Sequence, residues 1–140
     1  MSTIVAPARP YWTSAALWFV RGLLALVFVA AGGAKLYGVP MLVENFQHIG
    51  LGQWFRYVTG GLEIIGAILL LLPHKTVLGA LLLICIMVGA VITHLFIIGG
   101  SAVPAIVLLA LNAVVAYAGR GQIASLVKAS PAKTLPGKTS

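Results

Sequence analysis

Hydrophobic residues in this chain are grouped into four long runs with short polar breaks between them. The runs cover residues 14–36, 55–72, 77–98 and 102–119. Each has about the 17–25 residues that an α-helix needs to cross the hydrocarbon core of a membrane. Because the runs are continuous and do not alternate with polar residues, they do not fit a transmembrane β-barrel. The pattern predicts an all-α integral membrane protein with four spanning helices.

The connections between the runs predict how these helices pack. Pro73 ends the second run, and a GGS turn followed by Pro104 begins the fourth, so both connections are short. Short connections favour antiparallel neighbours, which predicts an up-down-up-down four-helix bundle. Residues 41–54 are too polar to span and too apolar for a plain loop. We expect them to form a short interfacial segment after the first helix, either a short helix or a re-entrant segment. The alternative is an irregular cap over the bundle mouth.

The chain divides into one domain and two ends. Residues 1–13 are expected to be a cytoplasmic lead, and residues 14–120 the four-helix transmembrane domain. Residues 121–140 are rich in Pro, Lys, Ser and Thr, which predicts a disordered cytoplasmic tail. The first run is longer than the hydrophobic part of a signal peptide and contains Arg21, so we expect an uncleaved helix.

Composition and charge agree with a membrane protein and indicate its orientation. The chain is 61% hydrophobic and 8% charged, with a net charge of +7. The basic residues lie in several separate segments, so we expect no nucleic-acid partner. In a four-span topology six Lys and Arg share the side of both termini, against Lys35 and Arg56 on the other side. The positive-inside bias then places both termini in the cytoplasm and the protein in the inner (plasma) membrane.

Glu63 is one of only two acidic residues and lies inside the second run. A carboxylate that faces lipid costs roughly 2.5–3.5 kcal/mol even on insertion scales, so Glu63 should face inward and have a polar partner. Helical spacing places it on one face with Gly60 and Ala67. The same spacing places Arg21, Phe28 and Lys35 on a single stripe of the first helix, and Leu83 and His94 on one face of the third.

His94 in the third run and Asn112 in the fourth are further polar candidates. At about 1.5 Å per residue, Lys35, Glu63 and His94 converge in the outer half of the bundle. Asn112 falls near the middle and Arg21 in the inner half. These five residues are the candidates for ligand binding or for a polar core, and Lys35, His94 and Arg21 are the candidate partners of Glu63.

Several classes of site are not expected. One membrane Glu, one membrane His and the single cysteine, Cys85, lie on different helix faces and do not make a metal site. Motifs for haem attachment, nucleotide binding or a nucleophile elbow do not occur. Two ionisable groups such as Glu63 and His94 suit proton transfer coupled to a bound molecule. The alternative is that these polar groups only fix the register of the helices.

Three segments together resemble the DoxX family of small four-span bacterial membrane proteins, over about residues 15–120. They are an arginine followed by AAGGAKLYG, the segment GGLEIIGAILLLLP, and a third run that ends in ITHLFIIGG. The matching polar residues are Arg21, Lys35, Glu63 and His94. Family members often carry an acidic residue after a Gly-rich turn behind the fourth span, whereas this chain has Gln122 and Ser125 there and no acid.

The resemblance implies a redox role. The family takes its name from a small membrane subunit associated with thiosulfate:quinone oxidoreductase, and other members are linked to oxidative-stress complexes with soluble partners. We therefore expect an accessory membrane subunit, with an oxidoreductase partner, that binds quinone or another lipophilic molecule near Glu63 and His94. Phe28, Met87 and Phe96 would surround the ligand. An oligomer is compatible with the sequence, and no covalently bound cofactor is expected.

Two other functions fit the same residues. The chain could be a non-enzymatic membrane scaffold or assembly protein whose polar core is structural. It could also be an enzyme or carrier for a lipophilic substrate in the bundle core. If a planar head group is bound, the segment 41–54 would cover the entrance, with Phe46 and Trp54 in contact with the ligand.

Overall fold

The computed structural model describes residues 11–128, and residues 1–10 and 129–140 lie outside the described part. Within residues 11–128 every regular element is a helix, which confirms the all-α class. The elements are α1 (Tyr11–Tyr37), α2 (Pro40–Ile49), α3 (Gln53–Leu71), α4 (Thr76–Thr93), the π-helical turn η1 (His94–Ile98), α5 (Val103–Ala118) and α6 (Arg120–Lys128).

Three segments of the described chain are long and apolar enough to cross a membrane. They are Ser14–Tyr37, Gln53–Leu71 and Thr76–Ile98, the last of which joins α4 and η1. The fourth expected span is represented by α5, which has 16 residues. At 1.5 Å per residue its length is about 24 Å, which is less than the roughly 30 Å of a hydrocarbon core. The four predicted runs are therefore all helical, but the fourth is shorter than the other three.

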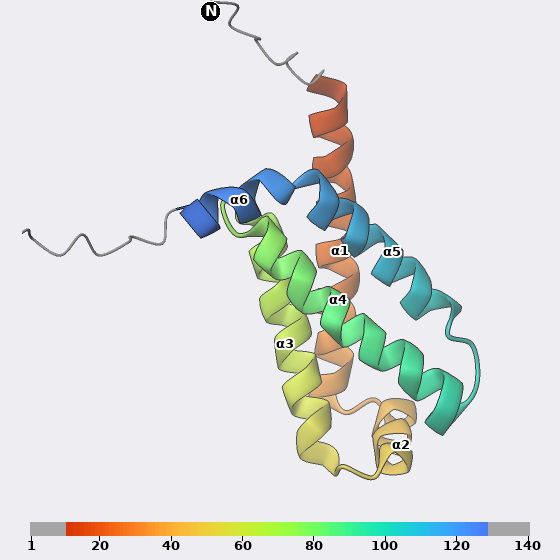
Figure 1. The fold of residues 1–140 in the computed structure, drawn as a ribbon. Helices are drawn as coiled ribbons and strands as arrows, with labels where there is room; N and C mark the ends of the chain where they lie inside the picture. Colours follow the sequence, from red (N-terminus) through yellow and green to blue (C-terminus); the bar gives the residue numbers. More distant parts are fainter. Residues whose placement is uncertain (1–10, 129–140) are drawn as a thin grey trace, which may run out of the picture.

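The helices form two antiparallel pairs that lean apart at one end. Figure 1 shows α1 beside α3 and α4 beside α5, with α2 lying across the lower end of the molecule. At the opposite end α3 and α4 are in close contact. A Cβ atom added to Gly79 would lie only 2.7 Å from the carbonyl oxygen of Gly66. Towards α2 the two helices diverge (Figure 1). The fold is therefore tight at the α6 end and wider at the α2 end.

The core follows the helical stripes that the sequence predicts. Phe28 on α1, Ala67 on α3 and Leu83 on α4 are all 0% exposed. Aliphatic and aromatic residues on the opposite faces of these helices, such as Phe19 and Ile65, are exposed. Such hydrophobic flanks fit a protein whose surroundings are lipid rather than water.

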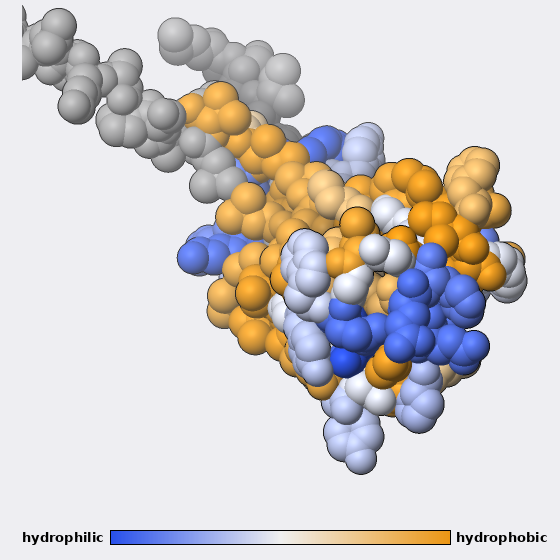
Figure 2. All heavy atoms as spheres, turned by 90° about the horizontal axis from the view of Figure 1, so that it is seen from below, coloured by the Kyte–Doolittle hydropathy of each residue, from blue (hydrophilic) through white to orange (hydrophobic). Residues whose placement is uncertain are grey.

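Helix α2 is an amphipathic cover over the wide end. The chain turns at Gly38, whose φ of +86° suits glycine, and α2 then starts at Pro40. Phe46 points inward and is buried, whereas Glu44 and His48 are exposed. Figure 2 views this end and shows a hydrophilic patch surrounded by hydrophobic flanks. A short helix within residues 41–54 was one of the predicted forms of this segment, and it is present.

The end of the chain differs from the prediction. A disordered tail was expected from residue 121, but α6 continues the fold to Lys128. The side chain of Gln122 explains part of the difference, because its Nε2 donates to the Pro73 carbonyl at 2.7 Å and its Oε1 accepts from the Val77 amide at 3.4 Å. The Pro- and Lys-rich composition behind the prediction belongs mainly to residues 129–140, which lie outside the described part. At the other end, residues 11–13 of the predicted lead are already helical.

Candidate functional site

Glu63 forms a buried ion pair with Lys35, one of its predicted partners. The Lys35 Nζ lies 2.9 Å from Oε1 and 2.8 Å from Oε2 of the carboxylate. Glu63 is only 2% exposed and the Lys35 side chain 16%. A carboxylate in the middle of α3 therefore has the inward position and the cation that the cost of burial requires.

The antiparallel pairing of α1 and α3 explains why these two side chains meet. Side chains on a helix lean towards its N-terminus, so Lys35 leans into the bundle from the end of α1, while Glu63 leans towards the α2 end. The two backbones touch one turn away, where a Cβ on Gly32 would lie 2.6 Å from the Gly60 carbonyl oxygen. This close approach brings the cation and the carboxylate within hydrogen-bonding distance.

Arg56 holds the same end of the bundle together, although from the sequence it entered only the balance of charges across the membrane. It is 4% exposed and donates from Nη1 to the Lys35 carbonyl oxygen in the last turn of α1. Its Nε donates to Gln53 Oε1 at 2.7 Å, and Gln53 in turn donates to the Val43 carbonyl of α2 at 3.0 Å. A cation suits the negative end of a helix. The sequence does contain a clue to this role. Arg56 lies near the start of α3, which an antiparallel arrangement places beside the end of α1.

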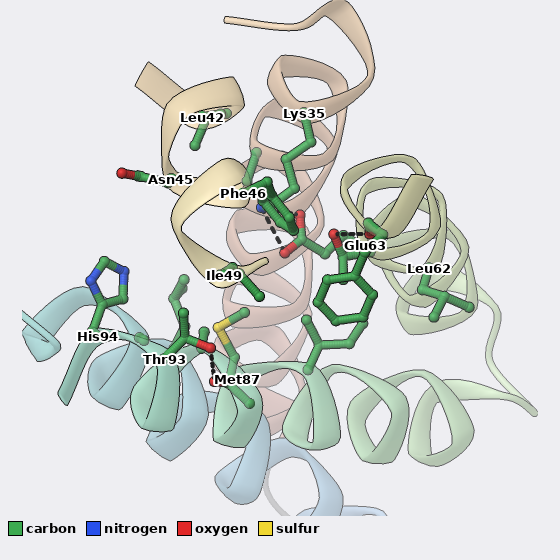
Figure 3. Close-up of a pocket in the computed structure, with 18 of the residues that line it drawn as sticks. Lys35, Leu42, Asn45, Phe46, Ile49, Leu62, Glu63, Met87, Thr93 and His94 are labelled. Atoms are coloured by element: carbon green, nitrogen blue, oxygen red, sulfur yellow. Dashed lines mark hydrogen bonds and ion pairs between the residues drawn. The ribbon is translucent and has the colours of Figure 1, made fainter. Parts of the chain in front are cut away.

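A cavity of about 490 Å³ opens beside the ion pair, in the wide end of the bundle. Figure 3 shows Lys35 and Glu63 on one side of it, Phe46 and Ile49 of α2 above it, and Met87 of α4 below it. Most of its wall is hydrocarbon. The polar residues among its lining are Lys35, Asn45, Thr59, Glu63, Cys85, Thr93 and His94.

His94 lies on another side of the same cavity (Figure 3). It begins the π-helical turn η1, a distortion that is frequent at functional sites. Its Nδ1 is 3.3 Å from the carbonyl oxygen of Gly99. Since a carbonyl oxygen can only accept, Nδ1 is the donor in this contact, and in the neutral imidazole Nε2 is then the acceptor. Among residues 11–128 no hydrogen bond joins His94 to Glu63, and Figure 3 shows the two residues on different sides of the cavity.

Arg21 and Asn112 do not belong to this site. Arg21 donates from Nε to the Leu70 carbonyl at 2.7 Å, and its guanidinium lies 4.0 Å from the Trp18 ring centroid. Asn112 is fully buried and donates to the Leu108 carbonyl at 2.8 Å. Neither lines the cavity. The structure therefore brings together three of the five candidates, Lys35, Glu63 and His94.

Two aromatic residues expected at the ligand are elsewhere. Phe96 is 80% exposed and Trp54 is 62% exposed, and neither lines the cavity. Phe96 follows His94 by two residues, and such neighbours point to nearly opposite sides of a helix. Next to Trp54, Phe55 takes the place at the cavity wall. Phe28, Met87 and Phe46, which were also expected at the ligand, line the cavity.

Comparison with known proteins identifies the family. Residues 19–119 match the DoxX-like family. Over 77 residues the chain is 36% identical to "Uncharacterized protein YdgD" of Bacillus subtilis (strain 168). The aligned region covers 52% of this chain and 68% of that protein. Over 74 residues it is 28% identical to "Putative oxidoreductase CatD" of the same organism. This second aligned region covers 53% of this chain and 55% of that protein. No solved structure matches. With its apolar helices and a match over most of its length, the chain belongs to the DoxX-like family and is a multi-pass membrane protein.

Proposed function

We propose that this protein is an integral membrane subunit of a redox system and that its cavity binds a quinone or another lipophilic molecule. The observation that carries the proposal is an apolar cavity with a buried ion pair and a histidine on separate walls. Its volume of about 490 Å³ is within the range of small-molecule sites, roughly 300–1,000 Å³. Such sites combine an apolar lining with a few polar groups that orient the ligand.

The polar groups suit both redox forms of a quinone. An ammonium group has three N–H donors, and the two contacts of Lys35 with Glu63 leave one for a quinone carbonyl. In its neutral form with the proton on Nδ1, His94 can accept a hydrogen bond at Nε2 from a quinol hydroxyl. Reduction of the quinone needs two electrons and two protons. A partner oxidoreductase would supply the electrons. The similarity to a protein named "Putative oxidoreductase CatD" supports a redox role for this chain.

The proposal includes a specific membrane placement. Four helices would cross the inner membrane up and down, with both termini cytoplasmic and α2 at the outer surface. Lys35 and Arg56, the two cations at the α2 end, are both held in contacts inside the fold. The remaining basic residues of loops and termini would then face the cytoplasm, as the positive-inside rule favours. The hydrophilic patch on the α2 end fits an interface with water (Figure 2).

A membrane scaffold is the second candidate. It is favoured by the contact between α1 and α3, where the Gly32–Gly60 approach and the Lys35–Glu63 ion pair join the helices without any ligand. In this case the ion pair would stabilise the bundle, and an apolar cavity would be filled by lipid.

Quinone binding by purified protein separates the two candidates. A short-chain ubiquinone analogue is titrated into the protein in nanodiscs, and tryptophan fluorescence reports binding, because Trp54 lies 5.8 Å from the ring of the cavity residue Phe55. We expect His94→Ala to raise the Kd about tenfold, which corresponds to the loss of one hydrogen bond to the ligand. Glu63→Gln should also raise the Kd, because the carboxylate that holds the Lys35 ammonium in place is lost. His74→Ala and Glu44→Gln are matched controls at exposed positions outside the cavity and should bind like the parent.

Two results would favour the scaffold. Either the parent protein binds no quinone, or both cavity variants bind as tightly as the parent. Glu63→Gln leaves the Lys35 ammonium unpaired and can lower stability. His94→Ala avoids this problem, because His94 is only half-buried and its ring makes a single, long contact.

A further inference from the structure

The cavity reaches the lipid-facing flank of the molecule between α3 and α4. Cys85 and Gly89, one turn apart on α4, line the cavity and are also exposed. Leu62 of α3 lines the cavity as well. Residues that belong both to a cavity wall and to the outer surface mark the place where the cavity opens.

Local packing explains why the wall is incomplete at this point. Gly66 and Gly79 hold α3 against α4 near their connecting turn, and beyond this contact the helices diverge. A Cβ on Gly89 would meet no other atom within 4 Å, so no side chain fills the space on this part of α4. The opening is therefore a consequence of how α4 leans away from α3.

The depth of the opening determines what it faces. Cys85 lies nine residues after Thr76, the first residue of α4, which corresponds to about 14 Å along the helix. This distance is close to half of a hydrocarbon core roughly 30 Å thick. An opening in the middle of the core faces the acyl chains of lipids, not water.

The polar and apolar residues of the cavity lining lie at different sides of the cavity. In Figure 3 His94 lies at one side of the cavity, close to Asn45 of α2, and Leu62 lies at the opposite side. The Lys35–Glu63 ion pair lies between them in this view, beside α2. A polar head group would therefore lie under α2, and the lining towards the opening is apolar except for Cys85.

We propose that the opening between α3 and α4, lined by Leu62, Cys85 and Gly89, is a lateral portal that holds the isoprenoid or alkyl tail of the bound molecule. The ligand would enter from the bilayer, and its tail would remain in the portal while the head group contacts Lys35 and His94. This inference rests on the proposed function and adds a tail subsite to it. It predicts that affinity depends on the ligand tail as well as on the head group.

Gly89→Phe tests the portal because it places a large side chain in the opening. Its affinity is measured in nanodiscs for a quinone with a long isoprenoid tail and for the same benzoquinone ring without a tail. We expect the Kd of the tailed quinone to rise at least tenfold and that of the tail-less ring to change less than twofold. Gly22→Phe is the control, because Gly22 is an exposed glycine on α1 with nothing within 4 Å and lies outside the cavity.

Cys85 provides an independent readout, because it is the only cysteine in the chain. The rate of its modification by a membrane-permeant maleimide is measured with saturating tailed or tail-less quinone. We expect the tailed quinone to slow modification at least fivefold and the tail-less ring to leave the rate unchanged.

The outcomes distinguish the portal from the proposed function. If no quinone binds the parent, the proposed function and the tail subsite both fail. If quinones bind but Gly89→Phe affects tailed and tail-less forms equally, or Cys85 is modified equally fast with both, the portal is wrong and the head-group site stands.

Discussion

Replacing Gly32 with alanine tests whether the contact between α1 and α3 creates the ion-pair site. The new Cβ would lie 2.6 Å from the Gly60 carbonyl oxygen and 2.8 Å from Ile64 Cγ1. Since ordinary contacts begin near 3.4 Å, the two helices must separate by about 0.8 Å at this point. Forcing extra volume into a well-packed interior typically costs about 1–3 kcal/mol. The same separation would pull Lys35 away from Glu63.

Gly33→Ala is a close control for this substitution. Gly33 is the next residue of the same helix, and a Cβ there meets nothing within 4 Å. Alanine is favoured over glycine inside a helix by about 1 kcal/mol, but this gain is shared by both variants and cancels in their difference. We expect Gly32→Ala to be about 1–3 kcal/mol less stable than Gly33→Ala.

The free energy of unfolding is measured by titrating a denaturing detergent into protein in mixed micelles, with helix content followed by circular dichroism. Quinone affinity is measured on the same samples. We expect Gly32→Ala to lose both stability and affinity, and Gly33→Ala to lose neither. Equal stability of the two variants would refute the close contact at Gly32. A loss of stability with unchanged affinity would show that the contact does not position the ligand site.

Two further predictions concern the α2 end and the topology. Arg56→Ala removes charge-assisted hydrogen bonds inside the fold and should lower the free energy of unfolding by about 1.5–3 kcal/mol. Arg120→Ala, at an exposed arginine, should change it by less than about 1 kcal/mol, and equal effects would show that Arg56 is not a structural cap. Reporter domains fused after residue 125 and inserted within residues 44–53 should report opposite sides of the membrane. Reporters on the same side would contradict the four-span topology.

Features that depend on a single helix could be predicted from the sequence. The apolar runs became helices, and the spacing of three or four residues put Phe28, Ala67 and Leu83 in the core. The inward position of Glu63 followed from the cost of a carboxylate in lipid. Lys35 was a predicted partner, because depth and helix face can both be estimated from residue numbers.

Features that depend on how helices approach each other could not be predicted. Gly79 and Gly89 look alike in the sequence, yet a Cβ on Gly79 would meet the α3 backbone, whereas Gly89 faces open space. This difference arises because α3 and α4 touch at one end and diverge at the other. The cavity, its opening and the buried position of Arg56 all depend on the same tertiary geometry. The nine residues of α6 were not predicted to be helical either, because the prolines that follow them made the whole C-terminal segment resemble a disordered tail.

The charged residues of this bundle differ in what surrounds them, and the difference bears on their purpose. Arg21 donates to a carbonyl in the last turn of α3 and Arg56 to one in the last turn of α1, so each cation stabilises the end of a neighbouring helix. The Lys35–Glu63 ion pair instead borders an unfilled cavity. Replacing a buried ion pair with apolar side chains is often neutral or stabilising, so stability alone does not account for this one. Its place in the cavity wall agrees with the proposed ligand site, in which Lys35 would be the donor to the bound molecule.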